Sequence, residues 1–295
     1  WVIMGFPALH FASNAELRRS LYARCLSVFE SRSTVASAAG IAALIGDCSA
    51  KEVLSTARGR FRTVCLCDIT KDDLADNTPD PSLFSLSSPA KLGCCDAFIS
   101  HSWHDDGDAK WASLQSWRSS FVSREHREPL VWLDKSCIDQ RNIQTDLRCL
   151  PLFLSSCSRL VVLFGKTYLS RLWCIVEIFV YVHMGGHFES IEIAPVLRSQ
   201  HEEEDSKAIK DFLTSFDARH CSCENAEDKE KILTAIHAAF GSTDRFNTVV
   251  QQQIMDHITW QGASGQFRCC SAPPSVNSSS SDSESESVSA ASSTS

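Results

Sequence analysis

The sequence predicts an α/β fold in which helices cover both faces of a parallel sheet. Short apolar runs recur at residues 96–100, 130–133, 160–164 and 191–197. Between one run and the next, apolar side chains are spaced as they are on a helix. The runs are apolar throughout rather than alternating, which is typical of strands that are buried on both faces. Strands of this kind that alternate with helices form a parallel sheet.

The chain before the first apolar run predicts a helical lead-in followed by a linker. Apolar residues recur every four positions from Leu17 to Phe29, and residues 50–61 are a second helix candidate. We therefore expect a helical lead-in of unknown role over residues 1–75. Residues 76–92 are rich in Pro, Ser and Asp, a composition that is typical of a linker.

The helix expected after the third strand is apolar on nearly every side. Within residues 172–184, the side chains that can carry a charge are Glu177 and His183. A helix that is apolar all round is expected to be buried. A carboxylate on such a helix is unfavourable unless it is paired, protonated or used in function. Glu177 is therefore the first candidate functional residue, and Gly185 with Gly186 is expected to end the helix.

The remainder of the chain predicts three further helices and a tail. Apolar side chains follow a helical period in residues 206–221, 225–240 and 243–258. The end of the chain is dominated by Ser with interspersed acidic residues, a composition that cannot bury a core. We therefore expect one α/β domain, with its C-terminal helices, over residues 93–260 and a disordered tail over residues 261–295.

Composition excludes several classes of function. The net charge of −8 is unfavourable for a nucleic-acid binder that acts by neutralising phosphates. No apolar run is long enough for a transmembrane helix, and no glycine-rich phosphate-binding motif is present. The 14 cysteines include no C-x-x-C pair, so we expect reduced thiols, no structural zinc site and a cytoplasmic setting. Because the chain starts at Trp1, we expect it to be a fragment.

The ends of the predicted strands carry the polar candidates. In a parallel sheet the usable crevice lies beyond the carboxyl ends of the strands. Those ends are residues 101–103, 134–135 and 165–166 in this chain. The acidic residues within 105–108 precede a predicted helix, where carboxylates commonly cap the N-terminus. We therefore expect no metal site there.

Three segments resemble motifs of the Toll/interleukin-1 receptor (TIR) domain family. Residues 96–105 are similar to the opening strand and loop of that domain, and residues 134–143 stand where the family has its BB loop. Residues 168–177 resemble the Ser-x-Trp-Cys-x-x-Glu motif. The most similar variant is the TIR-like domain of algae, oomycetes and other protists, and residues 132–140 show a shorter likeness to fungal HET domains. The resemblance implies a flavodoxin-like fold with a five-stranded parallel sheet.

The resemblance also implies cleavage of NAD in signalling, cell-death or immune-type responses, with NAD as substrate and no resident cofactor. In catalytic TIR domains the glutamate of the motif acts on the nicotinamide–ribose bond, and the matching residue is Glu177. A desolvated carboxylate can stabilise the ribosyl cation that forms as nicotinamide leaves. Trp173 lies one turn earlier on the same helix face and is expected to line the pocket. Further substrate-binding residues are expected at the strand ends: Ser100, His101, Trp103, Asp134 and Lys135.

A second interpretation is a signalling or scaffold module that acts without catalysis. The glutamate motif also occurs in TIR adaptors, so its presence does not decide between the two interpretations. In this family the BB loop gates the cleft and mediates TIR–TIR contacts, which implies other TIR domains or further copies of this chain as partners in a homo-oligomer. The BB-loop residues are Ser136, Cys137, Ile138, Asp139, Gln140, Arg141, Asn142 and Ile143.

Overall fold

The structure is a computed structural model that describes residues 50–183, 190–261 and 266–269 of the 295-residue chain. The helix expected over residues 17–29, the glycine pair at 185–186 and most of the expected tail lie outside these ranges. No helix within the described ranges is long and apolar enough to cross a membrane.

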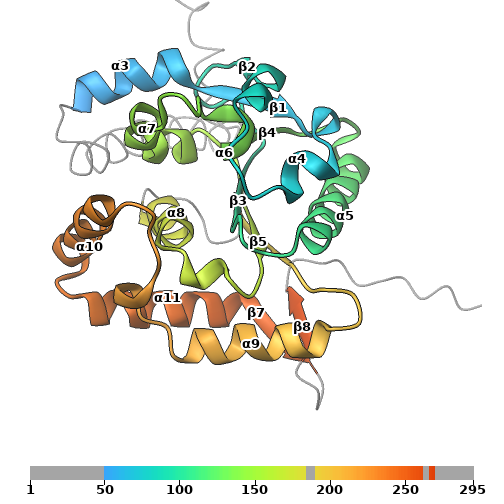
Figure 1. The fold of residues 1–295 in the computed structure, drawn as a ribbon, viewed down its shortest axis with the longest axis vertical. Coiled ribbons are helices and arrows are strands. Elements are labelled where there is room, and N and C mark those ends of the chain that lie inside the picture. Colours follow the sequence, from blue (N-terminus) through green and yellow to red (C-terminus); the bar gives the residue numbers. More distant parts are fainter. Residues whose placement is uncertain (1–49, 184–189, 262–265, 270–295) are drawn as a thin grey trace, which may run out of the picture.

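A six-stranded, mostly parallel sheet forms the centre of the fold (Figure 1). In spatial order the strands are β2 (Ser88–Pro89), β1 (Arg62–Cys65), β4 (Leu130–Leu133), β3 (Ala97–His101), β5 (Leu160–Phe164) and β6 (Ile191–Pro195). Strands β4, β3, β5 and β6 pair in parallel, whereas β1 pairs antiparallel with both β2 and β4. Every residue of β3 and β5 is buried, which explains why these runs are apolar throughout. The predicted α/β class is confirmed.

The antiparallel edge of the sheet comes from the segments that composition assigns to the lead-in and the linker. Strand β1 extends the sheet beyond β4, and β2 extends it beyond β1. The sheet therefore has six strands, where the resemblance implies five parallel ones. Residues 76–92 contain a 3-10 helix, η2 (Pro81–Leu86), whose N-cap Asp80 accepts a hydrogen bond from Ser82 N. The Pro and Asp that suggested a linker are the start signals of this short helix.

Helices cover both faces of the sheet, as predicted (Figure 1). Helix α5 (Gly107–Glu125) joins β3 to β4, and α7 (Ile143–Ser155) joins β4 to β5, which α8 (Leu172–His183) follows. From β3 the chain passes to β4 on one side of it in the sheet, and then to β5 and β6 on the other side. Because the crossovers are right-handed, this reversal places α5 on one face of the sheet and α7 and α8 on the other. Helix α3 (Ala50–Arg60) packs against α7, and α4 (Lys71–Ala75) packs against α5.

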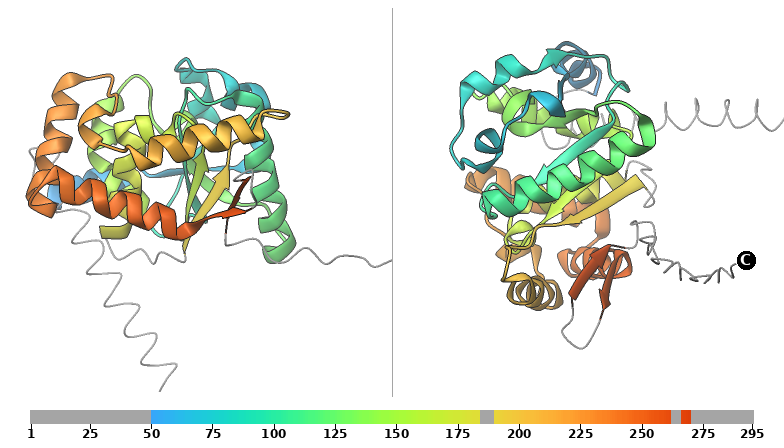
Figure 2. Two further views of the ribbon diagram at one scale, coloured as in Figure 1. Left: turned by 90° about the horizontal axis from the view of Figure 1, so that it is seen from below. Right: turned by 90° about the vertical axis from the view of Figure 1, so that its right-hand side faces the viewer.

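The C-terminal third adds a helical layer and a hairpin (Figure 2). The three predicted helices are present as α9 (Glu202–Thr214), α10 (Ala226–Phe240) and α11 (Thr243–His257), although α9 begins and ends earlier than predicted. Strands β7 (Ile258–Gln261) and β8 (Gln266–Cys269) pair antiparallel. The prediction of a tail from residue 261 was therefore wrong for β8, because a four-residue strand is too short to stand out in an average over a Ser-rich segment.

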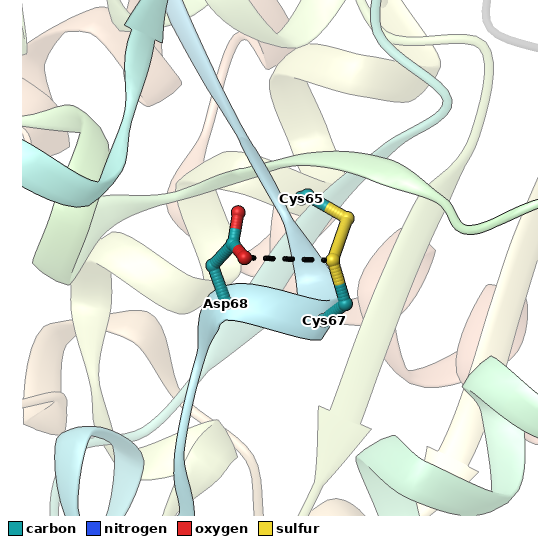
Figure 3. Close-up of side chains that lie close together, drawn as sticks. All are labelled: Cys65, Cys67 and Asp68. Atoms are coloured by element: carbon teal, nitrogen blue, oxygen red, sulfur yellow. Dashed lines mark hydrogen bonds between the residues drawn. A yellow bond between two sulfur atoms is a disulfide. The ribbon is translucent and has the colours of Figure 1, made fainter.

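One pair of thiols departs from the reduced state that composition predicts. Cys65 and Cys67 form a disulfide at the end of β1, and Asp68 lies beside it (Figure 3). Leu66 between them is fully buried, so the side chains on either side of it face outward. Their Cα atoms are 5.2 Å apart, within the usual range for a disulfide. Free thiols are present on seven further cysteines, most of them buried: Cys94, Cys95, Cys137, Cys157, Cys174, Cys221 and Cys223.

Candidate active site

A cavity of about 570 Å³ opens where β3 and β4 end. His101, the last residue of β3, and Asp134, the residue after β4, both line it. Trp103 in the β3–α5 loop and Trp173 on α8 add aromatic surface to its wall. The cavity therefore lies in the position expected for the binding crevice of a parallel sheet.

Glu177 of α8 lines this cavity. Its neighbours on the helix, including Val176 and Ile178, are buried, whereas Glu177 is only half-buried. Ser100 Oγ donates a hydrogen bond of 2.5 Å to Glu177 Oε2. Burial raises the pKa of Glu177 to about 8, the Ser100 hydrogen bond opposes this increase, and the negative charge of Asp134 adds to it. A carboxyl with this pKa exchanges its proton near neutral pH, as a catalytic acid or base does.

Asp134 organises the opposite wall of the cavity. Its Oδ1 is 3.0 Å from His101 Nε2 and accepts a hydrogen bond from Lys135 N, and its Oδ2 accepts one of 2.7 Å from Trp103 Nε1. Burial alone would raise the pKa of Asp134, but the adjacent His101 and these hydrogen bonds hold it below the usual range. Of the two carboxyl groups at the sheet end of the cavity, Asp134 is thus held ionised, whereas Glu177 holds its proton more tightly.

Lys135 does not line the cavity, although it was predicted to bind substrate. Its Nζ donates hydrogen bonds to the backbone carbonyls of Asp73, within α4, and Asp76, the residue that follows α4. The same ammonium group lies 5.1 Å from the ring centroid of Trp103, within the range of a cation–π contact. Lys135 therefore joins the α4 segment to the loop that carries Trp103.

The BB-loop residues divide into two groups. Five of them line the cavity: Ile138, Gln140, Arg141, Asn142 and Ile143. Ser136 and Cys137 are buried beneath the loop, and burial raises the pKa of the Cys137 thiol to about 12, so it is not a reactive thiolate. Asp139 faces Arg60 of α3 at 4.0 Å, and its backbone N donates to Asp146. The loop is therefore a wall of the cavity that is anchored to α3 and α7.

Sequence reasoning missed the wall that the C-terminal region contributes. Glu224, Asn225 and Asp228, on and before α10, line the cavity. Backbone hydrogen bonds from Leu172 N to Ser222 O and from Ser222 N to Ser170 O hold this segment against the start of α8. Nothing in the sequence signalled that residues 50 positions apart pair here. Arg171, within the recognised motif, also lines the cavity and bonds Glu224 at 3.1 Å.

The remaining acidic candidates have separate structural roles. Asp106 is the N-cap of α5 and accepts a hydrogen bond from Ala109 N, as predicted for that segment. Asp108 pairs with Lys71 at 2.8 Å. Among the described residues, the group that is close enough to share a metal ion is Cys65, Cys67 and Asp68, whose two sulfur atoms are bonded to each other.

Asp105 accepts hydrogen bonds from Thr167 N and Thr167 Oγ1 at 2.9 and 2.8 Å. It is nearly inaccessible, and burial raises the pKa of its carboxyl. Lys110, fully buried, donates to the carbonyls of Ser102 and Trp103. These contacts hold the β3–α5 loop that brings Trp103 to the cavity.

Comparisons with known proteins add no assignment. No family model matches this chain, and no curated protein matches it. The function of the cavity is therefore inferred from its geometry, from its charges and from the resemblance of the motifs.

Proposed function

We propose that this chain cleaves the nicotinamide–ribose bond of NAD at the cavity that contains Glu177. The observation that carries the proposal is that the cavity reaches Glu177, which is otherwise embedded in an apolar helix. A carboxyl with a purely structural role would be enclosed by its partners. The strand order β4-β3-β5-β6 corresponds to the order 2-1-3-4 of a flavodoxin-like sheet, which also supports the TIR resemblance.

The cavity suits a nucleotide in size and in lining. Its volume of about 570 Å³ falls within the range of small-molecule sites. Trp103 and Trp173 offer aromatic faces to a planar base or pyridinium ring. Arg141 and Arg171 are the guanidinium groups of its lining, and such groups bind the oxygens of a pyrophosphate.

The chemistry follows from the charge of Glu177. As the bond between C1′ of the ribose and the nicotinamide nitrogen breaks, its electron pair leaves with neutral nicotinamide and the ribose becomes an oxocarbenium-like cation. Ionised Glu177 stabilises this cation in a site of low polarity. Water then adds to C1′ and releases a proton, which gives ADP-ribose. Because the pKa of Glu177 is raised to about 8, the active ionised form becomes more abundant as the pH rises through that value.

An NAD-consumption assay on the full chain tests the proposal. Glu177→Gln should lower turnover by about 1000-fold, because loss of one preorganised electrostatic group has an effect of this order. Glu128→Gln is the matched control, since Glu128 is a partly exposed carboxylate paired with Arg118 outside the cavity. The assay is run over a range of protein concentrations, because the resemblance implies self-association. Intact NAD at the highest wild-type concentration would reject the proposal.

The alternative function is a non-catalytic module that associates through the BB loop. Arg141 and Asn142 are exposed at the cavity wall, where a second copy of the chain or another TIR domain can reach them. Under this alternative, Arg141→Glu abolishes self-association in sedimentation velocity, while Glu177→Gln leaves association and downstream signalling unchanged. Loss of signalling in Glu177→Gln without any change in association would favour the enzyme.

A further inference from the structure

The Cys65–Cys67 disulfide lies at the end of β4 that is opposite to the cavity. Strand β1 runs antiparallel to β4, and Cys65 pairs with Leu130, the first residue of β4. The cavity opens where β4 ends, and neither cysteine lines it. The disulfide is therefore a separate feature of the molecule, and its role does not depend on the function proposed for the cavity.

The chain around the disulfide is held in place without it. A disulfide stabilises a fold mainly by restricting the unfolded chain, and this effect grows with the length of the loop that it closes. The loop closed by this disulfide has Leu66 as its single inner residue. Leu66 is fully buried, and its backbone N donates a hydrogen bond of 3.1 Å to Pro129 O. A contribution to stability therefore does not account for the S–S bond.

The disulfide is accessible to a reagent from solution. Cys67 is exposed and Cys65 is half-buried, whereas most other cysteines that the structure describes, such as Cys137, are buried. Exposed disulfides are generally the labile ones, and structural disulfides resist reduction by glutathione.

The carboxylate of Asp68 lies beside the exposed sulfur atom. Asp68 Oδ1 is 3.6 Å from Cys67 Sγ (Figure 3). Once the S–S bond is broken, this oxygen can accept a hydrogen bond from the Cys67 thiol. The reduced pair thus has a hydrogen-bond acceptor already in place.

We propose that Cys65 and Cys67 are a redox-active pair that undergoes thiol–disulfide exchange with low-molecular-weight thiols of the glutathione type. The thiolate of one small thiol attacks Cys67 Sγ, the more exposed sulfur, and forms a mixed disulfide. The S–S bond to Cys65 breaks, and its electron pair stays on Cys65 Sγ, which takes up the proton that the small thiol has released. A second small thiolate attacks the small-thiol sulfur of the mixed disulfide and releases Cys67, which is protonated in the same way. Two electrons thus pass to the cysteine pair from two small thiols, which leave as their own disulfide.

Reduction of the folded full chain by glutathione tests the proposal. Oxidised protein is first alkylated, which blocks Cys94 and any other accessible thiol. It is then incubated with millimolar glutathione and a metal chelator, and new thiols are labelled with a second reagent and located by mass spectrometry. We expect the second label on Cys65 and Cys67, and we expect glutathione to be attached to Cys67 in samples quenched early with acid. Attachment to Cys65 instead would contradict the assignment of Cys67 as the attacked sulfur.

Two results of this experiment would overturn the proposal. One is a pair that stays oxidised until the chain is unfolded. The other is a wild-type chain in which oxidised glutathione produces no Cys65–Cys67 disulfide.

Thermal unfolding separates a redox-active pair from a structural one. The unfolding midpoints of the reduced wild type and of Cys67→Ser should lie within about 4 °C of that of the oxidised wild type, because the loop is so short. A much larger fall in both proteins would show that the fold requires the disulfide, and it would overturn the proposal.

Asp68→Asn measures the effect of the neighbouring charge on the rate of reduction. The carboxylate repels an incoming thiolate, so its loss should speed reduction by about two- to fivefold at low salt and by less at high salt. Asp72→Asn is the matched control, because it removes the same charge from an exposed residue of α4 outside the cluster of Cys65, Cys67 and Asp68. Equal gains in the two variants, or no gain in either, would contradict thiolate attack beside Asp68.

Discussion

Asp105 and Glu177 are two desolvated carboxyls near the same end of the sheet, and their surroundings differ. Burial raises the pKa of both. Asp105 is 4% exposed and receives two hydrogen bonds from Thr167, outside the cavity. Glu177 receives one hydrogen bond, from Ser100, and lines the cavity. A perturbed pKa alone therefore does not identify a functional acid, whereas access from a cavity separates the two residues.

Asp105 helps to position the loop that forms part of the cavity around Glu177. Asp105 connects the β3–α5 loop to Thr167, which follows β5. Lys110 fixes the same loop through the carbonyls of Ser102 and Trp103. Trp103 then reaches Asp134 at the cavity wall. One carboxyl thus stabilises the loop, and the other is free to meet a ligand that this loop helps to bind.

The largest expected effect is a difference in unfolding free energy between variants of the two carboxyls. Asp105→Ala leaves the buried Thr167 N without its acceptor and removes the hydrogen bond from the Thr167 hydroxyl, so the free energy of unfolding should fall by about 2–4 kcal/mol. Glu177→Gln should change it by less than about 1 kcal/mol at pH 6, where the wild-type residue carries its proton. Urea unfolding at pH 6 measures both values. Equal losses in the two variants would show that Glu177 is as structural as Asp105.

A second test concerns the space around Asp105. A Cβ at Gly165 would lie 2.3 Å from the Asp105 carboxyl, so Gly165→Ala should destabilise the fold by about 1–3 kcal/mol. In the double variant, Gly165→Ala with Asp105→Ala, the clash is absent. The double variant should therefore lose less stability than the sum of the losses in the two single variants. Thermal unfolding of the four proteins gives this cycle. Additive losses would mean that Gly165 is required for some other reason.

The pH dependence of stability should also distinguish the two regions. Glu177 has a pKa of about 8 in the folded state against an ordinary pKa of 4.5, so the folded state binds more protons between these values. Its contribution is complete below about pH 4.5 and is lost as the pH rises through 8. We expect a loss of about 4 kcal/mol between pH 5 and 9 that is absent in Glu177→Gln. Burial raises the pKa of Asp105 as well, so its contribution to stability is also lost as the pH rises, starting from an ordinary pKa of 3.8. A wild type and a Glu177→Gln variant with parallel profiles would contradict the raised pKa.

The sequence predicted the elements whose pattern is local and missed those that depend on distant pairing. Buried strands such as β5 are continuous apolar runs, and Glu177 was conspicuous because its helix is otherwise apolar. The two-residue strand β2 carries no period of its own and exists only through its pairing with β1. Tyr168 lay within a recognised motif, but its link to Ser100 joins residues 68 positions apart. Such contacts are fixed by packing, which a linear pattern does not show.

The smallest expected effect concerns the ion pair at the C-terminal wall of the cavity. Glu224 is 84% exposed and bonds Arg171 at 3.1 Å, so Glu224→Gln should change the free energy of unfolding by less than about 0.5 kcal/mol. The same change frees the Arg171 guanidinium, which lines the cavity, to bind a phosphate. Affinity for ADP-ribose, measured by calorimetry, should therefore rise by about two- to fivefold. Glu227→Gln is the control, because it changes the net charge by the same amount and removes an exposed ion pair with Lys231 outside the cavity lining. If both variants change affinity equally, the effect is one of net charge, and Arg171 has no specific part in binding.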